Sequence, residues 1–266
     1  MKTRVCIAGA TGWVGKALSL AVARSSDLSL VAAVSRSKAG QTLGEIVGER
    51  SIEVKVSGSV SEALATPADV FVDYTKADAV KGHVLAAIER GLHVVIGSSG
   101  LGDDDYVQID NAARARKVGV VAAGNFAITA VLLQRFACEA AKFLKQWEII
   151  DYAPDTKKDA PSGTARELAY RLGQVGAPEL THPVDKTIGP RECRGATMNG
   201  MQVHSVRLPG HSVGVEAIFG APLEKLRIRQ EGGGGPDPDI QGTLLALRKV
   251  SGRVGLVRGL DHVMGL

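Results

Sequence analysis

The segment 157–164, KKDAPSGT, places a cation a few residues before a sequence that can bind an anion. Lys157 precedes Ser162, Gly163 and Thr164, which open a stretch with helical spacing, RELAYRLGQV. The first amides of a helix have no partners within it, and the positive end of the helix dipole favours negative charge. Ser162 would also serve as an ordinary N-cap, which is compatible with anion binding. The segment therefore predicts an anion site at the start of a helix.

A glycine-rich turn lies near the N-terminus, where GATGWVG follows the apolar stretch RVCIA. Glycines at 9, 12 and 15 let backbone amides approach a pyrophosphate at the start of a helix. The spacing differs from the standard GxGxxG, and a strand-to-helix turn without a ligand is the alternative. Its place in the first strand–helix unit favours a dinucleotide bound at Gly9, Gly12 and Gly15.

The second apolar stretch ends in Val34-Ser35-Arg36, where a dinucleotide fold usually presents an acidic side chain to the adenosine ribose. Ser35 and Arg36 can instead bind the 2′-phosphate of NADPH by a hydrogen bond and a charge pair. Lys38 is an equal candidate for the phosphate, and Arg36 could be a solvated surface residue. We expect NADPH as the cofactor, with NADH possible.

Two later strand ends carry small or hydroxyl residues at the edge where parallel sheets bind ligands. Without the glycine turn these residues would read as simple turn residues. Together with it they predict a cofactor cleft that includes Tyr74, Thr75, Gly97, Ser98 and Ser99.

The elements that would position these residues alternate between apolar strands and amphipathic helices over the first 126 residues, which predicts a parallel sheet of Rossmann type. Residues 127–239 contain two helical patterns and strands grouped with period-two alternation, which predicts an α+β domain with a mixed or antiparallel sheet. GGGGPDPD, at 232–239, is expected to be a loop or hinge, and 240–266 to return to the first domain. The fold class is α/β.

The composition argues against several classes of binding partner and site. The 266 residues carry a net charge of +4, but the basic residues are scattered and aromatics make up 4%, so nucleic acid is not expected. Three cysteines without paired spacing indicate neither disulfides nor a metal site and fit a reducing cytoplasm. No apolar stretch is long enough for a transmembrane helix, and we expect no signal peptide, because the apolar stretch near the N-terminus soon reaches glycine and threonine.

The chain resembles the dihydrodipicolinate reductase family, whose members reduce a cyclic imine-type intermediate of diaminopimelate and lysine biosynthesis with NAD(P)H. The matching segments, in the family's order, are AGATGWVG, DYT, VIGSSG, AGNF, KKDAPSGTA, VHSVRLPG and GTLLALRKV. The resemblance implies a homotetramer or homodimer and a small carboxylated substrate bound at Gly163 and Thr164. It also implies cofactor contacts from three segments: Gly9, Ala10, Thr11, Gly12, Trp13 and Val14; Gly97, Ser98 and Ser99; and Ala123, Gly124, Asn125 and Phe126.

One departure from the family bears on catalysis. The family's two adjacent histidines fall on Ala153 and Pro154, whereas its lysine falls on Lys157. Neither alanine nor proline donates a proton, so Lys157 is the first choice for an acid or electrostatic role. It could also be a solvated loop lysine, and Tyr152 and His204 are the other candidate acids. A substrate that is already an iminium would need no acid.

Two other functional classes stay open at this point. A catalytically impaired reductase-like chain could bind NADP and act as a sensor or scaffold. An unrelated two-domain dehydrogenase of an amino acid or sugar would explain the glycine turn but not DAPSGT.

Overall fold

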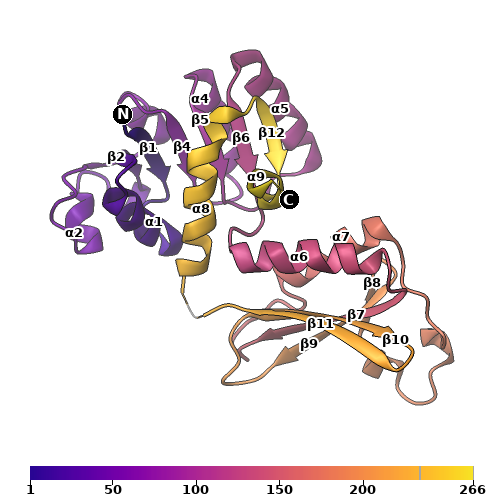
Figure 1. The fold of residues 1–266 in the computed structure, drawn as a ribbon. Helices are drawn as coiled ribbons and strands as arrows, with labels where there is room; N and C mark the ends of the chain where they lie inside the picture. Colours follow the sequence, from indigo (N-terminus) through magenta and orange to yellow (C-terminus); the bar gives the residue numbers. More distant parts are fainter. Residues whose placement is uncertain (234, 266) are drawn as a thin grey trace. The chain divides into compact units, whose positions relative to one another are not determined.

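The chain folds into two compact units (Figure 1), seen in a computed structural model that describes residues 1–233 and 235–265. One unit joins Met1–Ile128 to Pro236–Leu266, and the other is the continuous segment Thr129–Gly235. The cofactor motifs fall in the first unit and the KKDAPSGT segment in the second.

The first unit is built on a seven-stranded sheet in the order β12-β6-β5-β4-β1-β2-β3. All of its pairs are parallel, as the alternation of strands and helices predicts. The strands are β1 (Thr3–Ala8), β2 (Leu28–Val34), β3 (Val56–Ser57), β4 (Val70–Asp73), β5 (His93–Ile96), β6 (Gly119–Ala122) and β12 (Gly255–Arg258).

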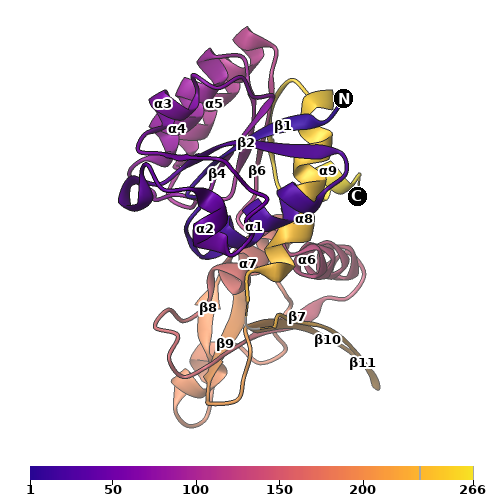
Figure 2. The ribbon, with the colours of Figure 1, turned by 90° about the vertical axis from the view of Figure 1, so that its left-hand side faces the viewer.

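Helices cover both faces of this sheet, so its central strands β4, β5 and β6 are mostly buried and apolar, apart from the buried Asp73 that ends β4 and the partly exposed His93 that begins β5. Figure 2 shows α1 (Trp13–Arg24), α8 (Asp237–Lys249) and α9 (Leu260–Met264) on one side. The opposite layer consists of α3 (Val60–Ala63), α4 (Val80–Glu89) and α5 (Asp103–Arg116). A short α2 (Leu43–Val47) and 3-10 turns at Arg36–Lys38 and Val250–Gly252 complete the unit.

The sequence patterns differ from the structure at two places in this unit. Residues 42–64 form the short elements α2, β3 and α3, which are too brief to show a period. Of the expected loop at 232–239, residue 234 lies outside the described residues, and α8 already begins at Asp237. Asp237, Pro238 and Asp239 suit a first helical turn, because proline needs no donor there and the carboxylates face the positive end of the dipole.

The second unit contains a five-stranded mixed sheet in the order β11-β10-β7-β9-β8. Its strands are β7 (Gln146–Ala153), β8 (Ala196–Met198), β9 (Met201–Arg207), β10 (Gly214–Ala221) and β11 (Glu224–Glu231). The helices α6 (Ile128–Ala141) and α7 (Gly163–Val175) pack on one face, and 3-10 turns lie at Val184–Lys186 and Arg191–Arg194. The expected α/β class, with a Rossmann-type sheet and a second mixed sheet, is confirmed.

The two pairings of β9 make this sheet mixed, one of the two arrangements expected from the sequence. β9, within the period-two stretch 201–210, pairs antiparallel with β8 but parallel with β7, with Asp151 opposite Ser205 and Ala153 opposite Arg207. The connection from β7 passes through α7 to β8, which pairs antiparallel with β9, so the β8–β9 hairpin brings the chain back parallel to β7. Strand periodicity reports which residues face the core and does not report strand direction.

No helix within residues 1–233 and 235–265 is both long and apolar enough to cross a membrane. Across the same described residues, His, Cys, Asp and Glu side chains form no group of three or more that could hold a metal ion.

Candidate functional site

A cavity of about 600 Å³ opens where β1, β2 and β4 of the first unit end. Seven of the residues expected to contact the cofactor line it: Gly9, Thr11, Gly12, Ser35, Arg36, Tyr74 and Thr75. Others line it without having been expected: Val34, Ser37, Gly58, Ser59, Val60, Lys76, Ala79 and His83. The remaining expected residues do not line this cavity: Ala10, Trp13, Val14, Gly97, Ser98, Ser99, Ala123, Gly124, Asn125 and Phe126.

The glycine turn has the geometry of a phosphate-binding loop. Gly9 has a φ of +79°, which non-glycine residues rarely adopt, and its amide donates to the Val34 carbonyl at 3.0 Å. A Cβ at Gly9 would lie 2.3 Å from the Tyr74 carbonyl oxygen. Because the N-cap residue Gly12 has no side chain, the first amides of α1 stay available to an anion.

The end of β2 presents hydroxyl and guanidinium groups to the same cavity. Ser35 Oγ lies 2.6 Å from Thr11 Oγ1, and the Ser35 amide donates to the Ser57 carbonyl at 3.0 Å. Arg36 and Ser37 follow in a 3-10 turn and line the cavity. The group has the composition of a phosphate subsite, since a guanidinium and hydroxyls are strong donors to phosphate oxygens.

Asp73, at the end of β4, organises the cavity wall from a fully buried position. Its Oδ1 accepts from Ser98 Oγ at 2.6 Å, from Thr75 Oγ1 at 2.7 Å and from the Thr75 amide at 2.9 Å. Its Oδ2 lies 2.9 Å from His83 Nδ1. Ser98 therefore does not line the cavity, but it bonds to Asp73, which holds the cavity residue Thr75. His83 could have been suspected from the sequence, because it lies in the first turn of the helix that follows DYT.

Tyr74 and Phe126 connect the strand ends to α8. The Tyr74 hydroxyl lies 2.6 Å from Thr243 Oγ1, and the Tyr74 and Phe126 ring centroids are 6.2 Å apart. The Phe126 amide donates to Asp239 Oδ1 at 3.2 Å. Burial raises the pKa of Tyr74 above its ordinary value, so its phenol stays protonated and packs as part of the wall.

In the second unit, the expected anion site lies where α7 begins. Ser162 is the N-cap, and its Oγ accepts from the Ala165 amide at 3.2 Å. Gly163 and Thr164 form the first turn between these two residues. Lys157 Nζ lies 2.7 Å from Asp159 Oδ1, and this lysine holds the pKa of the Asp159 carboxyl below its ordinary value.

Tyr152 lies on the opposite face of the sheet from Asp151 and Ala153, since successive strand residues point to opposite faces. Its hydroxyl donates to Glu216 Oε2 at 2.9 Å, and the Arg229 guanidinium lies 4.4 Å from its ring centroid. Burial, followed by the bond to Glu216, raises the pKa of Tyr152. The Tyr152 phenol is therefore hydrogen-bonded to Glu216.

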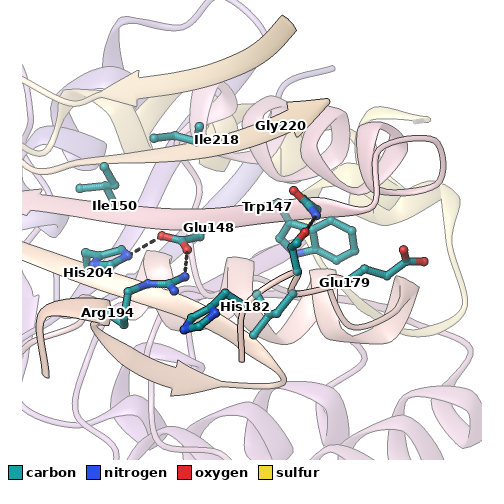
Figure 3. Close-up of a pocket in the computed structure, with 12 residues that line it drawn as sticks. Trp147, Glu148, Ile150, Glu179, His182, Arg194, His204, Ile218 and Gly220 are labelled. Atoms are coloured by element: carbon teal, nitrogen blue, oxygen red, sulfur yellow. Dashed lines mark hydrogen bonds and ion pairs between the residues drawn. The ribbon is translucent and has the colours of Figure 1, made fainter. Parts of the chain in front are cut away.

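His204, the other candidate acid, lies in a separate cavity of about 440 Å³ in the second unit (Figure 3). Its Nε2 lies 2.7 Å from Glu148 Oε2, and Arg194 Nη2 donates to Glu148 Oε1 at 2.7 Å. Figure 3 shows Glu148 between these two side chains. His204 is therefore paired with Glu148, a neighbour on the same sheet.

Comparisons with known proteins cover almost the whole chain. The family model described as "Dihydrodipicolinate reductase, N-terminus" matches residues 3–126, and that described as "Dihydrodipicolinate reductase, C-terminus" matches residues 129–264. The 4-hydroxy-tetrahydrodipicolinate reductase of Syntrophomonas wolfei is 34% identical over 267 residues, covering 99% of each chain. That of Thermosynechococcus vestitus is 36% identical, covering 98% of this chain and 96% of its own.

Solved structures agree with this. Dipicolinate-bound dihydrodipicolinate reductase from Paenisporosarcina sp. TG-14 superposes with a TM-score of 0.87 at 30% identity, over 98% of this chain and 99% of its own. An amine dehydrogenase from Mycobacterium smegmatis, at 14% identity and a TM-score of 0.67 over 97% of this chain and 95% of its own, shares the fold alone. On the strength of the full-length matches, the chain belongs to the dihydrodipicolinate reductase family.

Proposed function

We propose that the protein is an NADPH-dependent 4-hydroxy-tetrahydrodipicolinate reductase, or a close variant acting on a related small, carboxylated cyclic imine or enamine. The observation that carries the proposal is the position of Lys157, which is paired with Asp159, a few residues before the helix start Ser162 to Thr164, in a chain that matches the family over both units. These groups would offer a carboxylate a cation and the positive end of a helix dipole.

NADPH, when bound, would supply a hydride, and the cavity of the first unit has the groups to hold it. The amides of the Gly9–Gly12 turn suit the pyrophosphate, and Ser35, Arg36 and Ser37 suit a 2′-phosphate. A carboxylate in place of these groups would repel that phosphate, which is why we propose NADPH over NADH. The segments Gly97–Ser99 and Ala123–Phe126 would hold the rest of the cofactor.

The substrate would be bound by the second unit. We assign one carboxylate to the Gly163 and Thr164 amides, with the Thr164 hydroxyl beside them and Ser162 fixing the turn. Addition of hydride to a C=N bond leaves the nitrogen with a lone pair that takes a proton. Ala153 and Pro154 cannot provide it, and we assign that proton, or the neutralisation of the developing charge, to the Lys157 ammonium.

Turnover by the unmodified protein tests this proposal. We expect NADPH oxidation that depends on the lysine-pathway substrate generated in the same solution, and competition by pyridine-2,6-dicarboxylate. Tight NADPH binding without turnover above background would refute the assignment and indicate instead a binding-only sensor or scaffold. Sedimentation of the same preparation would show whether it forms the homotetramer or homodimer that we propose from the family.

Arg36→Ala tests the 2′-phosphate subsite. Loss of a charge-assisted bond should weaken NADPH binding by about 10- to 100-fold, whereas NADH, which lacks the phosphate, should bind as before. Fluorescence titration with each nucleotide measures both constants. Lys38→Ala is the matched control, because Lys38 ends the same turn but does not line the cavity. If Lys38→Ala produces the NADPH-specific loss instead, the phosphate partner is Lys38.

A further inference from the structure

We infer that Arg207 and Asp151 are positioning residues that hold the 157–163 loop in the form that receives the substrate carboxylate. They lie at the ends of neighbouring strands, β9 and β7, where the register places Asp151 opposite Ser205 and Ala153 opposite Arg207. Neither residue belongs to the loop itself. The inference rests on the proposed function and names what gives that carboxylate site its shape.

Asp151 holds the start of α7 through a single oxygen. Its Oδ2 accepts from the Ser162 amide at 2.9 Å, from Arg207 Nη2 at 2.6 Å and from Ser205 Oγ at 3.2 Å, and the side chain is fully buried. Ser162 is the N-cap of α7, so its amide lies directly before the turn that offers amides to an anion. Asp151 therefore fixes where that turn begins.

Arg207 contacts the loop at Asp159, through the nitrogen that also contacts Asp151. Nη2 donates to the Asp159 carbonyl at 2.7 Å as well as to Asp151, while Nη1 donates to the Val206 carbonyl at 2.9 Å. The Asp159 carboxylate in turn pairs with Lys157. A continuous set of contacts thus runs from Lys157 through Asp159, Arg207 and Asp151 to Ser162, and it sets the distance between the cation and the helix amides.

Stability alone gives a weak reason for burying this pair. Removing two charges from water is costly, and buried ion pairs are often replaced by apolar residues without loss of stability. Within residues 1–233 and 235–265, Asp151 Oδ1 and Arg207 Nε are buried without a hydrogen-bond partner, which adds a further cost. The cost of burying the Asp151–Arg207 pair is explained if the loop geometry that the pair imposes serves substrate binding.

Arg207→Lys is the decisive variant. A lysine keeps the charge but lacks the planar fork, so it cannot serve both Asp151 and the Asp159 carbonyl with the same geometry. We expect the dissociation constant for pyridine-2,6-dicarboxylate to rise by about tenfold or more, and amide hydrogen exchange over residues 155–163 to become faster. NADPH binding, which belongs to the other unit, should not change.

Two comparisons keep the test specific. Arg171→Lys makes the same change on α7, where Arg171 pairs with Glu167, and should leave dicarboxylate binding and loop exchange unaltered. Asp151→Asn is isosteric and removes the charge that Arg207 and Ser162 share, so it should reproduce the effect of Arg207→Lys. If one variant fails to fold, as judged by thermal melting, the other decides.

The outcomes separate this inference from the proposed function. Faster loop exchange with unchanged dicarboxylate binding would make the pair merely structural and overturn the inference. Unchanged binding and exchange in both variants would also overturn it, with the proposed function left standing. Failure of the unmodified protein to bind the dicarboxylate would refute the substrate site and the inference together.

Discussion

Lys157→Ala is expected to lower kcat/KM for the proposed substrate by about 10²-fold or more, within the range for a positioned proton-transfer group. The Lys157 ammonium lies in the same loop as the helix start that we assign to the carboxylate, and its Asp159 partner holds it there. Removal of the ammonium leaves Ala153 and Pro154 nearby on the chain, and neither can donate a proton. Steady-state NADPH oxidation measures the effect.

Lys158→Ala is the matched control for this experiment, because it removes the same charge one residue later. We expect its kcat/KM to stay close to that of the unmodified enzyme, because this variant lowers the charge of the loop but leaves the Lys157 ammonium in place. An unaltered rate in Lys157→Ala would remove this residue from its assigned role. It would favour a substrate that reaches the enzyme as an iminium and needs hydride alone.

Gly15→Val is expected to lower the free energy of unfolding by about 3 kcal/mol, the upper end of the cost of overpacking. A Cβ at Gly15 would lie 2.0 Å from the Gly9 carbonyl oxygen and 2.9 Å from Ala10 Cα. These are backbone atoms of the glycine turn, so α1 would have to move away from it. Thermal unfolding should show Tm lowered by roughly 6–12 °C, and NADPH binding should weaken as well.

Gly82→Ala provides a control of opposite sign. Gly82 lies within α4, and apart from its chain neighbours and the backbone of its own helix, no heavy atom of the described residues lies within 4 Å of the position that its Cβ would occupy. Alanine there should stabilise the protein by about 0.5–1 kcal/mol, because it restricts the unfolded chain and suits a helix better. If both substitutions destabilise the protein equally, the close approach of α1 to the glycine turn is not what excludes a side chain at residue 15.

The sequence predicted the features that depend on local periodicity and on glycine. The alternating strands and helices of the first unit follow from burial on both faces of a sheet, and Gly9 has the positive φ that its turn requires. Gly58 and Ser59 line the cavity that we assign to the cofactor, but the sequence does not identify them, because the short elements around them carry no readable period. Periodicity needs several turns or strand residues before it shows.

The 157–163 loop shows a different limit. Its own residues identify a helix start and a cation, but the groups that hold its shape come from distant positions. Asp151 and Arg207 are 56 residues apart and meet only because β7 and β9 are parallel neighbours, a pairing that the period-two pattern of 201–207 does not encode. Strand order and direction arise from packing of the whole unit, so the sequence does not predict this contact.

The return of the chain to its first sheet has a consequence for synthesis on the ribosome. β12 pairs with β6, and Arg248 of α8 bonds to Asp27 at 2.7 Å, so the nucleotide-binding unit needs residues from both ends of the chain. Thr129–Gly235 is continuous and can fold as soon as it has emerged. The loop that we assign to the substrate is therefore expected to be in place before the cavity that we assign to NADPH is complete.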